Sequence, residues 1–182
     1  MLKDQCHLCP CLFVHVEWLL IFDVDGVLTD GTILVATNGD MFRKMHTKDG
    51  YVLKHAVDCG YHICIISGGN NEGVRKRLNG LGIEDVYLGV HHKIKTLETY
   101  LQKKGLKMKE VMYMGDDIPD LEIMQKVGLA CCPQDAVQEI KKTSHYVSHK
   151  KGGKGCVRDV VEQILKVQNN WLNKDKISAQ YD

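Results

Sequence analysis

Short apolar runs alternate with amphipathic segments along most of the chain. The apolar runs have the length and composition of buried β-strands and lie at residues 18–23, 62–67, 85–89, 110–115, 129–133 and 145–148. Segments with apolar positions three or four residues apart predict helices, at residues 48–60, 71–80, 93–104, 120–127, 135–142 and 157–171. This alternation predicts an α/β fold with a doubly wound, mainly parallel sheet and helices on both faces.

The segment 32–46 interrupts this alternation. It contains two short strand-like stretches joined by Asn38-Gly39, a dipeptide typical of two-residue β-hairpin turns. We therefore predict a small β-hairpin flap between the first strand and the first helix.

Length and composition favour one globular domain. The chain has 182 residues, of which 44% are hydrophobic and 26% charged, and these values are ordinary for a domain with its own core. We assign residues 1–17 to an N-terminal extension, 18–170 to the domain and 171–182 to a frayed tail. The net charge of +1 provides no attraction to nucleic acid or to an anionic membrane. No run approaches the roughly 18 apolar residues of a membrane helix, and the scattered cysteines suit a cytoplasmic protein with reduced thiols.

Residue types that ligate zinc cluster near the N-terminus, at Cys6, His7, Cys9, Cys11 and His15. Their spacing could hold zinc. No second paired cluster completes a familiar zinc-binding pattern. We therefore favour the alternative, a loosely ordered leader.

Polar side chains stand at the ends of three predicted strands. Asp23 and Asp25 end the first strand, and Ser67 ends the second. The strand at 110–115 is followed by a run of acids, Asp116, Asp117 and Asp120. Ligands of doubly wound sheets bind beyond the carboxyl ends of the strands, so we expect these groups to meet at one edge of the sheet.

Carboxylates gathered at one edge repel one another, which raises their pKa values and costs stability. A divalent cation removes this conflict. A site built from carboxylate oxygens favours magnesium, which leaves coordination positions open for a substrate phosphate. The acids therefore predict a Mg²⁺ site that serves a phosphoryl group.

Two further features fit a phosphate ligand. Ser67-Gly68-Gly69 brings a hydroxyl and backbone N–H groups to the end of a strand, and Lys93 opens a predicted helix from which it could reach the same edge. Each feature has an ordinary alternative, which is a strand-to-helix turn for the Ser-Gly-Gly segment and a solvated surface position for the lysine. For each acid taken alone, the alternative is turn formation or N-capping. Their occurrence together after successive strands favours the phosphate site.

Four segments resemble, in order, the motifs of the haloacid dehalogenase (HAD) superfamily of phosphohydrolases. They are DVDGVLTDG (23–31), Ser67, Lys93 and GDDIPD (115–120). The resemblance covers about residues 18–150. It implies a HAD-like Rossmannoid fold and the hydrolysis of phosphoric monoesters.

The resemblance also implies a role for each motif residue. Asp23 would attack phosphorus and form an aspartyl-phosphate, and Asp25 would protonate the leaving alcohol and then activate water. Ser67 and Lys93 would bind the transferring phosphoryl group. The magnesium shell would consist of Asp23, the backbone carbonyl of Asp25 and Asp116, supported by Asp117 and Asp120.

A narrower resemblance concerns the substrate. Residues 31–48 have room only for a hairpin and residues 70–93 only for a helix and a strand, so the chain resembles members without a cap domain. The hairpin and KGGKGCVRD (151–159) are similar to phosphatases of 3-deoxy-D-manno-octulosonate 8-phosphate, which act in lipopolysaccharide biosynthesis. This likeness implies a phosphorylated sugar-acid substrate and a homotetramer in which a neighbouring subunit covers each site. Its substrate-binding candidates are Gly68, Gly69, Arg75 and Arg158.

Several alternatives stay open at this stage. Arg75 is otherwise a helix-surface charge, and the glycines at 152, 153 and 155 indicate either a loop that closes over substrate or an ordinary turn. Gly69 stands where some relatives have a charged, substrate-selecting side chain, so a nonulosonate (sialic acid-type) 9-phosphate or another sugar phosphate is an alternative substrate. A non-catalytic tetramerisation module and a signalling receiver are the competing classes, and the presence of Asp25 argues against both.

Overall fold

The structure, a computed structural model, describes residues 18–172. The predictions made for residues 1–17, including the zinc alternative, and for residues 173–182 lie outside the described residues. Within the described range, no helix combines the length and apolar character needed to cross a bilayer.

One six-stranded sheet forms the centre of the molecule, in the order β5-β4-β1-β6-β7-β8. Its strands are β1 (Leu19–Phe22), β4 (Ile63–Ile66), β5 (Asp85–Tyr87), β6 (Val111–Met114), β7 (Leu129–Cys132) and β8 (Tyr146–Val147). Every neighbouring pair is parallel, which confirms the predicted sheet. The chain winds outward from β1 in one direction and then in the other, so β1 lies at the switch point, where such sheets bind ligands.

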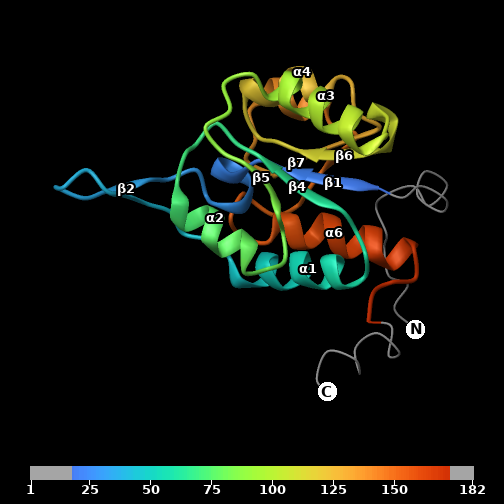
Figure 1. The fold of residues 1–182 in the computed structure, drawn as a ribbon, viewed down its shortest axis with the longest axis horizontal. Helices are drawn as coiled ribbons and strands as arrows, with labels where there is room; N and C mark the ends of the chain where they lie inside the picture. Colours follow the sequence, from blue (N-terminus) through green and yellow to red (C-terminus); the bar gives the residue numbers. More distant parts are fainter. Residues whose placement is uncertain (1–17, 173–182) are drawn as a thin grey trace.

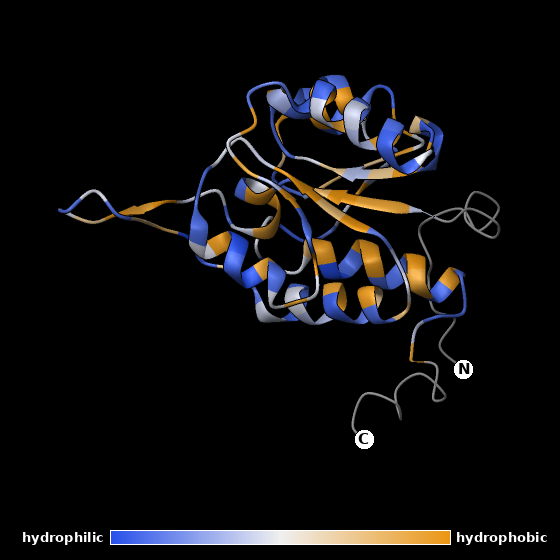
Figure 2. Cartoon of the chain, viewed as in Figure 1, coloured by the Kyte–Doolittle hydropathy of each residue, from blue (hydrophilic) through white to orange (hydrophobic). Residues whose placement is uncertain are grey.

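Helices cover both faces of this sheet (Figure 1). One face carries α1 (Thr47–Asp58), α2 (Glu72–Asn79) and α6 (Cys156–Val167). The other carries α3 (Lys93–Lys104), α4 (Leu121–Met124) and α5 (Gln138–Thr143). The apolar residues concentrate in the strands and on the helix faces turned toward them (Figure 2).

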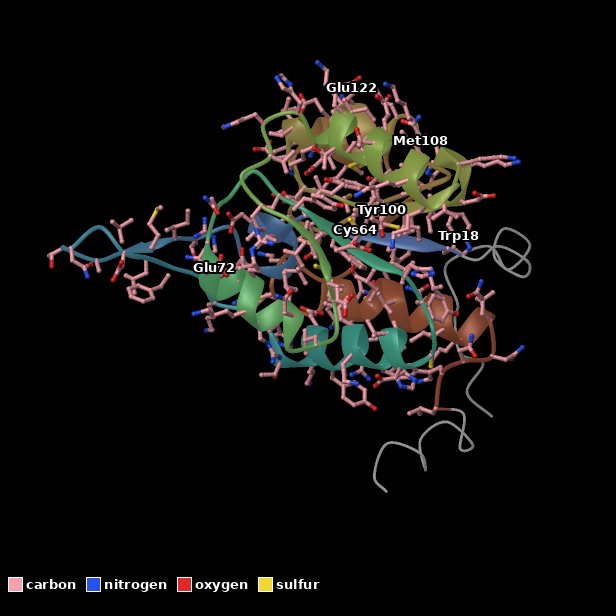
Figure 3. The ribbon with its side chains drawn as sticks, viewed as in Figure 1. Trp18, Cys64, Glu72, Tyr100, Met108 and Glu122 are labelled. Carbon is pink, nitrogen blue, oxygen red and sulfur yellow. The ribbon has the colours of Figure 1, made fainter. Side chains whose placement is uncertain are left out.

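Alternation along β1 divides the core into two layers. Leu20 and Phe22 pack toward α1 and α6, whereas Leu19 and Ile21 pack toward α3, because successive side chains of a strand point to opposite faces. Figure 3 labels two members of the second layer, Cys64 of β4 and Tyr100 of α3. With both faces covered, the four central strands β1, β4, β6 and β7 are fully buried and carry no charged residue, and the charged groups of the site lie beyond the strand ends.

The helices α1, α2 and α3 begin and end within two residues of their predicted bounds, whereas α4, α5 and α6 each depart from them by three or more residues at one end. The single turn of α4 follows a 3₁₀ turn, η4 (Ile118–Asp120), and α5 begins only after a turn closed by the N–H of Ala136 on the carbonyl of Pro133. The helix α6 ends at Val167 because Asn169 adopts a positive φ of 57°. This conformation turns the chain back, so that the N–H of Asn170 donates to the carbonyl of Leu165 at 2.8 Å.

The predicted hairpin is present and consists of β2 (Leu34–Val35) and β3 (Met41–Phe42), paired antiparallel. Gly39 in its turn has a φ of 89°, a conformation that favours glycine. The hairpin projects away from the body (Figure 1). Its apolar side chains are consequently exposed, Leu34 by 71% and Phe42 by 54%.

Candidate active site

The turn after β1 places the first two acids. The N–H of Asp23 donates to the carbonyl of Met114 on β6, and the carboxylate of Asp23 accepts from the N–H of Val24 at 2.7 Å. Gly26 follows with a φ of 88°, and a Cβ at this position would lie 2.0 Å from Oδ2 of Asp116. Only glycine therefore allows the Asp116 carboxylate to approach this turn.

A buried lysine joins two of the carboxylates. Nζ of Lys93, at the start of α3, lies 2.9 Å from Oδ2 of Asp23 and 2.7 Å from Oδ1 of Asp120. Burial lowers the pKa of Lys93, but the charges and hydrogen bonds of Asp23 and Asp120 outweigh it and raise that pKa above its ordinary value. The ammonium therefore keeps its charge and holds the two acids together.

Asp120 is the centre of a hydrogen-bond network. The hydroxyl of Tyr113 on β6 donates to its Oδ1 at 2.6 Å, and the N–H of Asp116 donates to its Oδ2 at 3.1 Å. Sequence reasoning missed Tyr113, because within its apolar strand it has the pattern of an ordinary core residue. Its position seven residues before Asp120 carries no signal that the two side chains meet.

Three carboxylates, those of Asp23, Asp116 and Asp120, offer oxygens within 4.8 Å of one another. Burial and then the charge of Asp120 raise the pKa of Asp23 to about 6. Burial and the charges of Asp23 and Asp120 raise the pKa of Asp116 to about 8. These pKa values are raised because the carboxylates lie close together and are largely shielded from solvent.

This arrangement fits a divalent cation. Oδ1 of Asp116 is buried and has no hydrogen-bond partner within residues 18–172, which leaves it available as a metal ligand. Both oxygens of Asp120 already accept hydrogen bonds, so Asp120 is suited to orienting its neighbours. Within the described residues Asp116 therefore offers the open ligand oxygen, whereas both oxygens of Asp23 are already contacted, by the N–H of Val24 and by Lys93. The ligand set of Asp23, Asp116 and the backbone carbonyl of Asp25 stays a prediction.

Asp25 lies apart from the three carboxylates, in an ion pair with Arg43. Nε of Arg43 is 2.8 Å from Oδ1 of Asp25, and Nη2 is 3.0 Å from Oδ2, the two-pronged geometry of a strong arginine–carboxylate contact. Sequence reasoning missed Arg43, because nothing in the local pattern shows that the end of the hairpin returns to the site.

The Ser67 segment lies beside this ion pair. Ser67 is buried at the end of β4, and its hydroxyl oxygen accepts from the N–H of Gly69 at 3.3 Å. Asp25, Arg43, Ser67 and Gly69 border the same narrow space. The predicted meeting of β1 and β4 residues at one edge is thus found.

Three other predicted residues, Arg75, Arg158 and Gly68, have their contacts away from the carboxylates, whereas the N–H of a fourth, Asp117, donates to Oδ2 of Asp120 at 3.5 Å. Arg75 binds the carbonyl of Val86 at 2.7 Å and faces Glu72. Arg158 pairs with Glu162 and lies over the rings of Tyr51 and Trp171. The exposed Asp117 caps η4 by accepting from the N–H of Ile118, and Gly68 lies near the carbonyl of Val90. Their roles in binding stay predictions.

The glycines at 152 and 153 serve close packing. A Cβ on Gly152 would lie 1.9 Å from the carbonyl oxygen of Gly26, and one on Gly153 would lie 2.5 Å from the N of Asp30. The N–H of Gly153 donates to the carbonyl of Val27 at 2.9 Å. In this structure the loop braces the turn after β1, which explains the glycines without a closing motion.

A carboxylate cluster with a buried lysine, at the switch point of a doubly wound sheet, defines a hydrolase of the metal-assisted phosphoryl-transfer class. The model of the haloacid dehalogenase-like hydrolase family matches residues 85–158. The 3-deoxy-D-manno-octulosonate 8-phosphate phosphatase KdsC of Salmonella typhi is 37% identical over 150 residues, 82% of this chain and 80% of that protein. The chain therefore belongs to the haloacid dehalogenase-like hydrolases, in the group that contains these phosphatases.

Solved structures agree with this assignment. The 3-deoxy-D-manno-octulosonate 8-phosphate phosphatase of Moraxella catarrhalis, in complex with magnesium, phosphate and KDO, matches with a TM-score of 0.86 and 31% identity, over 95% of this chain and 97% of that one. The cobalt-bound phosphatase of Haemophilus influenzae matches with a TM-score of 0.83 and 27% identity, over 93% of this chain and 99% of that one.

Proposed function

We propose that the protein is a magnesium-dependent phosphatase that hydrolyses 3-deoxy-D-manno-octulosonate 8-phosphate to the sugar acid and phosphate. The observation that carries this proposal is the buried carboxylate of Asp23, held 2.9 Å from Lys93 beside the unpartnered Oδ1 of Asp116. A fixed carboxylate, a cation and a free metal ligand are what phosphoryl transfer to an aspartate requires.

In the first step, the Asp23 carboxylate forms a bond to phosphorus while the ester P–O bond breaks. The Asp25 carboxyl gives its proton to the leaving oxygen, which departs as an alcohol. Lys93 holds the nucleophile and, with Ser67, binds the phosphoryl oxygens. Asp25 lies two residues from Asp23 on the same turn, so one rigid segment presents both groups.

In the second step, water attacks the phosphorus of the aspartyl-phosphate and gives a proton to Asp25. The bond from Asp23 to phosphorus breaks, phosphate leaves, and both acids return to their starting states. Asp23, Asp116 and the backbone carbonyl of Asp25 would hold the magnesium ion, with Asp120 orienting them through Lys93 and the N–H of Asp116. When bound, magnesium supplies positive charge to the phosphoryl group.

The substrate assignment rests on the relatives, which are named as phosphatases of 3-deoxy-D-manno-octulosonate 8-phosphate. A nonulosonate 9-phosphate or another sugar phosphate is the alternative, because Gly69 offers no side chain to select among sugars. The ratio of kcat/KM values over a panel of these phosphates separates the candidates. We expect the octulosonate phosphate to lead, and a lead by simple hexose phosphates would overturn the substrate while leaving the phosphatase intact.

We further propose a homotetramer that works in the cytoplasm, in lipopolysaccharide biosynthesis. The exposed apolar hairpin supports assembly, since such patches mark interfaces. Four buried cysteines of the described residues, Cys64, Cys131, Cys132 and Cys156, are free thiols, which suits a reducing compartment.

The decisive test replaces the nucleophile. Asp23→Asn should lower magnesium-dependent kcat by more than about a thousandfold, while Asp58→Asn, at an exposed position of α1, should retain it. Release of phosphate from the octulosonate phosphate is the measurement, with circular dichroism to verify folding. Full activity in Asp23→Asn would refute the mechanism.

A further inference from the structure

The two cations of the site serve different carboxylates. Lys93 contacts Asp23 and Asp120. Among the carboxylates of the described residues, Arg43 contacts Asp25 alone, through Nε and Nη2 at 2.8 to 3.1 Å. The side chain of Arg43 is only 5% exposed and that of Asp25 27%. Apart from Arg43, the side-chain contact of the Asp25 carboxylate within residues 18–172 is the hydroxyl of Thr29 at 3.4 Å, so Arg43 fixes its orientation.

Arg43 is held where it can do this. It follows β3 directly, at the base of the hairpin and not at its tip. Nδ2 of Asn71 donates to the carbonyl of Met41 at 2.9 Å, while Oδ1 of Asn71 caps α2 by accepting from the N–H of Val74. The base of the hairpin is thereby attached to the body, and Arg43 approaches Asp25 from a fixed point.

Gly69 makes room for the ion pair. A Cβ at residue 69 would lie 2.7 Å from Oδ2 of Asp25 and 3.1 Å from Nη2 of Arg43. Any side chain at this position would press on both partners. The ion pair between Arg43 and Asp25 therefore depends on glycine at residue 69, which leaves space for the arginine of the hairpin beside the Ser67 segment.

We propose that Arg43 is a positioning residue that aims the Asp25 carboxyl at the leaving oxygen and then at the attacking water. This inference rests on the proposed function. In the first step the proton of Asp25 passes to the leaving alcohol as the ester P–O bond breaks. In the second, a proton of water passes to Asp25 as the new P–O bond forms and the bond to Asp23 breaks.

The leaving group makes this role measurable. A sugar alkoxide is a poor leaving group and needs the proton from Asp25, whereas 4-nitrophenolate leaves without it. Both substrates give the same aspartyl-phosphate, whose hydrolysis needs Asp25 as base. A misaimed Asp25 therefore slows the first step for the sugar phosphate only and the second step for both.

The experiment compares Arg43→Gln with wild type and with the control Lys44→Gln, an exposed neighbour outside the site. For the sugar phosphate we expect kcat to fall roughly a hundredfold with KM changed by less than about threefold. With 4-nitrophenyl phosphate, rapid mixing should show a first turnover near the wild-type rate, then slow hydrolysis of the phosphoenzyme. Arg43→Lys, which keeps the charge but not the two-pronged contact, should recover part of the loss.

Gly69→Ala would place a methyl group against Asp25 and Arg43. It should slow the first step for the sugar phosphate and phosphoenzyme hydrolysis for both substrates. With 4-nitrophenyl phosphate, equal slowing of the first turnover and of phosphoenzyme hydrolysis in Arg43→Gln would indicate a general structural role and overturn the proposal. A sugar-phosphate kcat within twofold of wild type would do the same. If Asp23→Asn keeps full activity, the proposed function fails, and this inference fails with it. If Asp23→Asn is inactive and Arg43→Gln is fully active, only this inference is overturned.

Discussion

Charge balance at the site explains its need for a cation. The carboxylates of Asp23, Asp25, Asp116 and Asp120 face two cations, Lys93 and Arg43. With all six groups ionised, two negative charges remain uncompensated. One divalent ion would neutralise these two charges. Without the ion, burial and the charges of Asp23 and Asp120 raise the pKa of Asp116 to about 8, so the Asp116 carboxyl holds its proton more strongly.

The stability of the metal-free protein should fall as pH rises. The folded pKa values of Asp23 and Asp116, about 6 and about 8, lie above their unfolded values, so the folded state binds more protons between pH 4 and 8 and loses stability as they leave. Urea unfolding at pH 5 and pH 8 measures this loss, and Mg²⁺ should reduce it at pH 8 because it binds the ionised acids.

Asp116→Asn is the matched control for this prediction, because asparagine imitates the protonated acid. At pH 5 the free energy of unfolding of Asp116→Asn should be near that of wild type. At pH 8 without Mg²⁺ the variant should have the larger free energy of unfolding. The variant should also lose most of the stabilisation by Mg²⁺. A metal-free wild type that gains stability from pH 5 to pH 8 relative to Asp116→Asn would contradict the pKa shifts.

Tyr113→Phe should destabilise the protein by about 1 to 2 kcal/mol, because Oδ1 of the buried Asp120 loses its 2.6 Å donor. Because Asp120 orients Lys93 and the N–H of Asp116, kcat should also fall, by roughly tenfold. Tyr87→Phe, at a partly exposed ring of β5, serves as the control. Unchanged unfolding and activity in Tyr113→Phe would show that Lys93 and the N–H of Asp116 hold Asp120 without the Tyr113 hydroxyl.

Among the elements, the hairpin has two separate tasks. Its base supplies Arg43 to the site, while its strands present Leu34 and Phe42, which pair across β2 and β3, to the exterior. A two-stranded ribbon has little stability of its own, so its exposed apolar residues support the proposed contact with other subunits.

Leu34→Asp should therefore disrupt assembly without unfolding the subunit. Leu34 is 71% exposed, so the charge costs the isolated subunit little, whereas it would be buried in an interface between hairpins. Light scattering at micromolar concentration should give a tetramer for wild type and for Thr37→Asp at the hairpin turn, and a smaller species for Leu34→Asp. A monomeric wild type would overturn the assembly.

At the scale of the whole molecule, the glycine loop before α6 supports the turn after β1. The glycine loop before α6 packs on the turn after β1 through backbone contacts, and Asp49 of α1 accepts the N–H groups of Gly155 and Arg158. These contacts join segments more than a hundred residues apart. The site turn is thereby held from the sheet side and from the α6 side.

Gly152→Ala should be destabilising by about 3 kcal/mol or more, since its Cβ would overlap the carbonyl of Gly26 and only backbone could move aside. Gly80→Ala is the control, because Gly80 has an ordinary helical φ of −65° and an exposed position. Urea midpoints measure both. A Gly152→Ala midpoint equal to that of wild type would mean that the loop is free to withdraw.

The sequence by itself determined the alternation of elements, the hairpin turn and the residues at the strand ends. These depend on local periodicity, on turn chemistry at Asn38-Gly39 and on the rule that parallel strands end at one edge. Asp23, Lys93 and Asp120 could therefore be predicted to meet, and they do. Helix ends were less predictable, because α6 ends where Asn169 reverses the chain.

Only the tertiary structure decided which partner each charged group takes. Arg43 reaches Asp25 because the hairpin base is attached to α2, Tyr113 reaches Asp120 because η4 folds back over β6, and Gly152 meets Gly26 because α6 packs beside α1. Arg75 and Arg158, which are candidates only through the resemblance to sugar-acid phosphatases, have partners elsewhere in this structure. Such contacts depend on the packing of whole elements, which the spacing of residues along the chain does not encode.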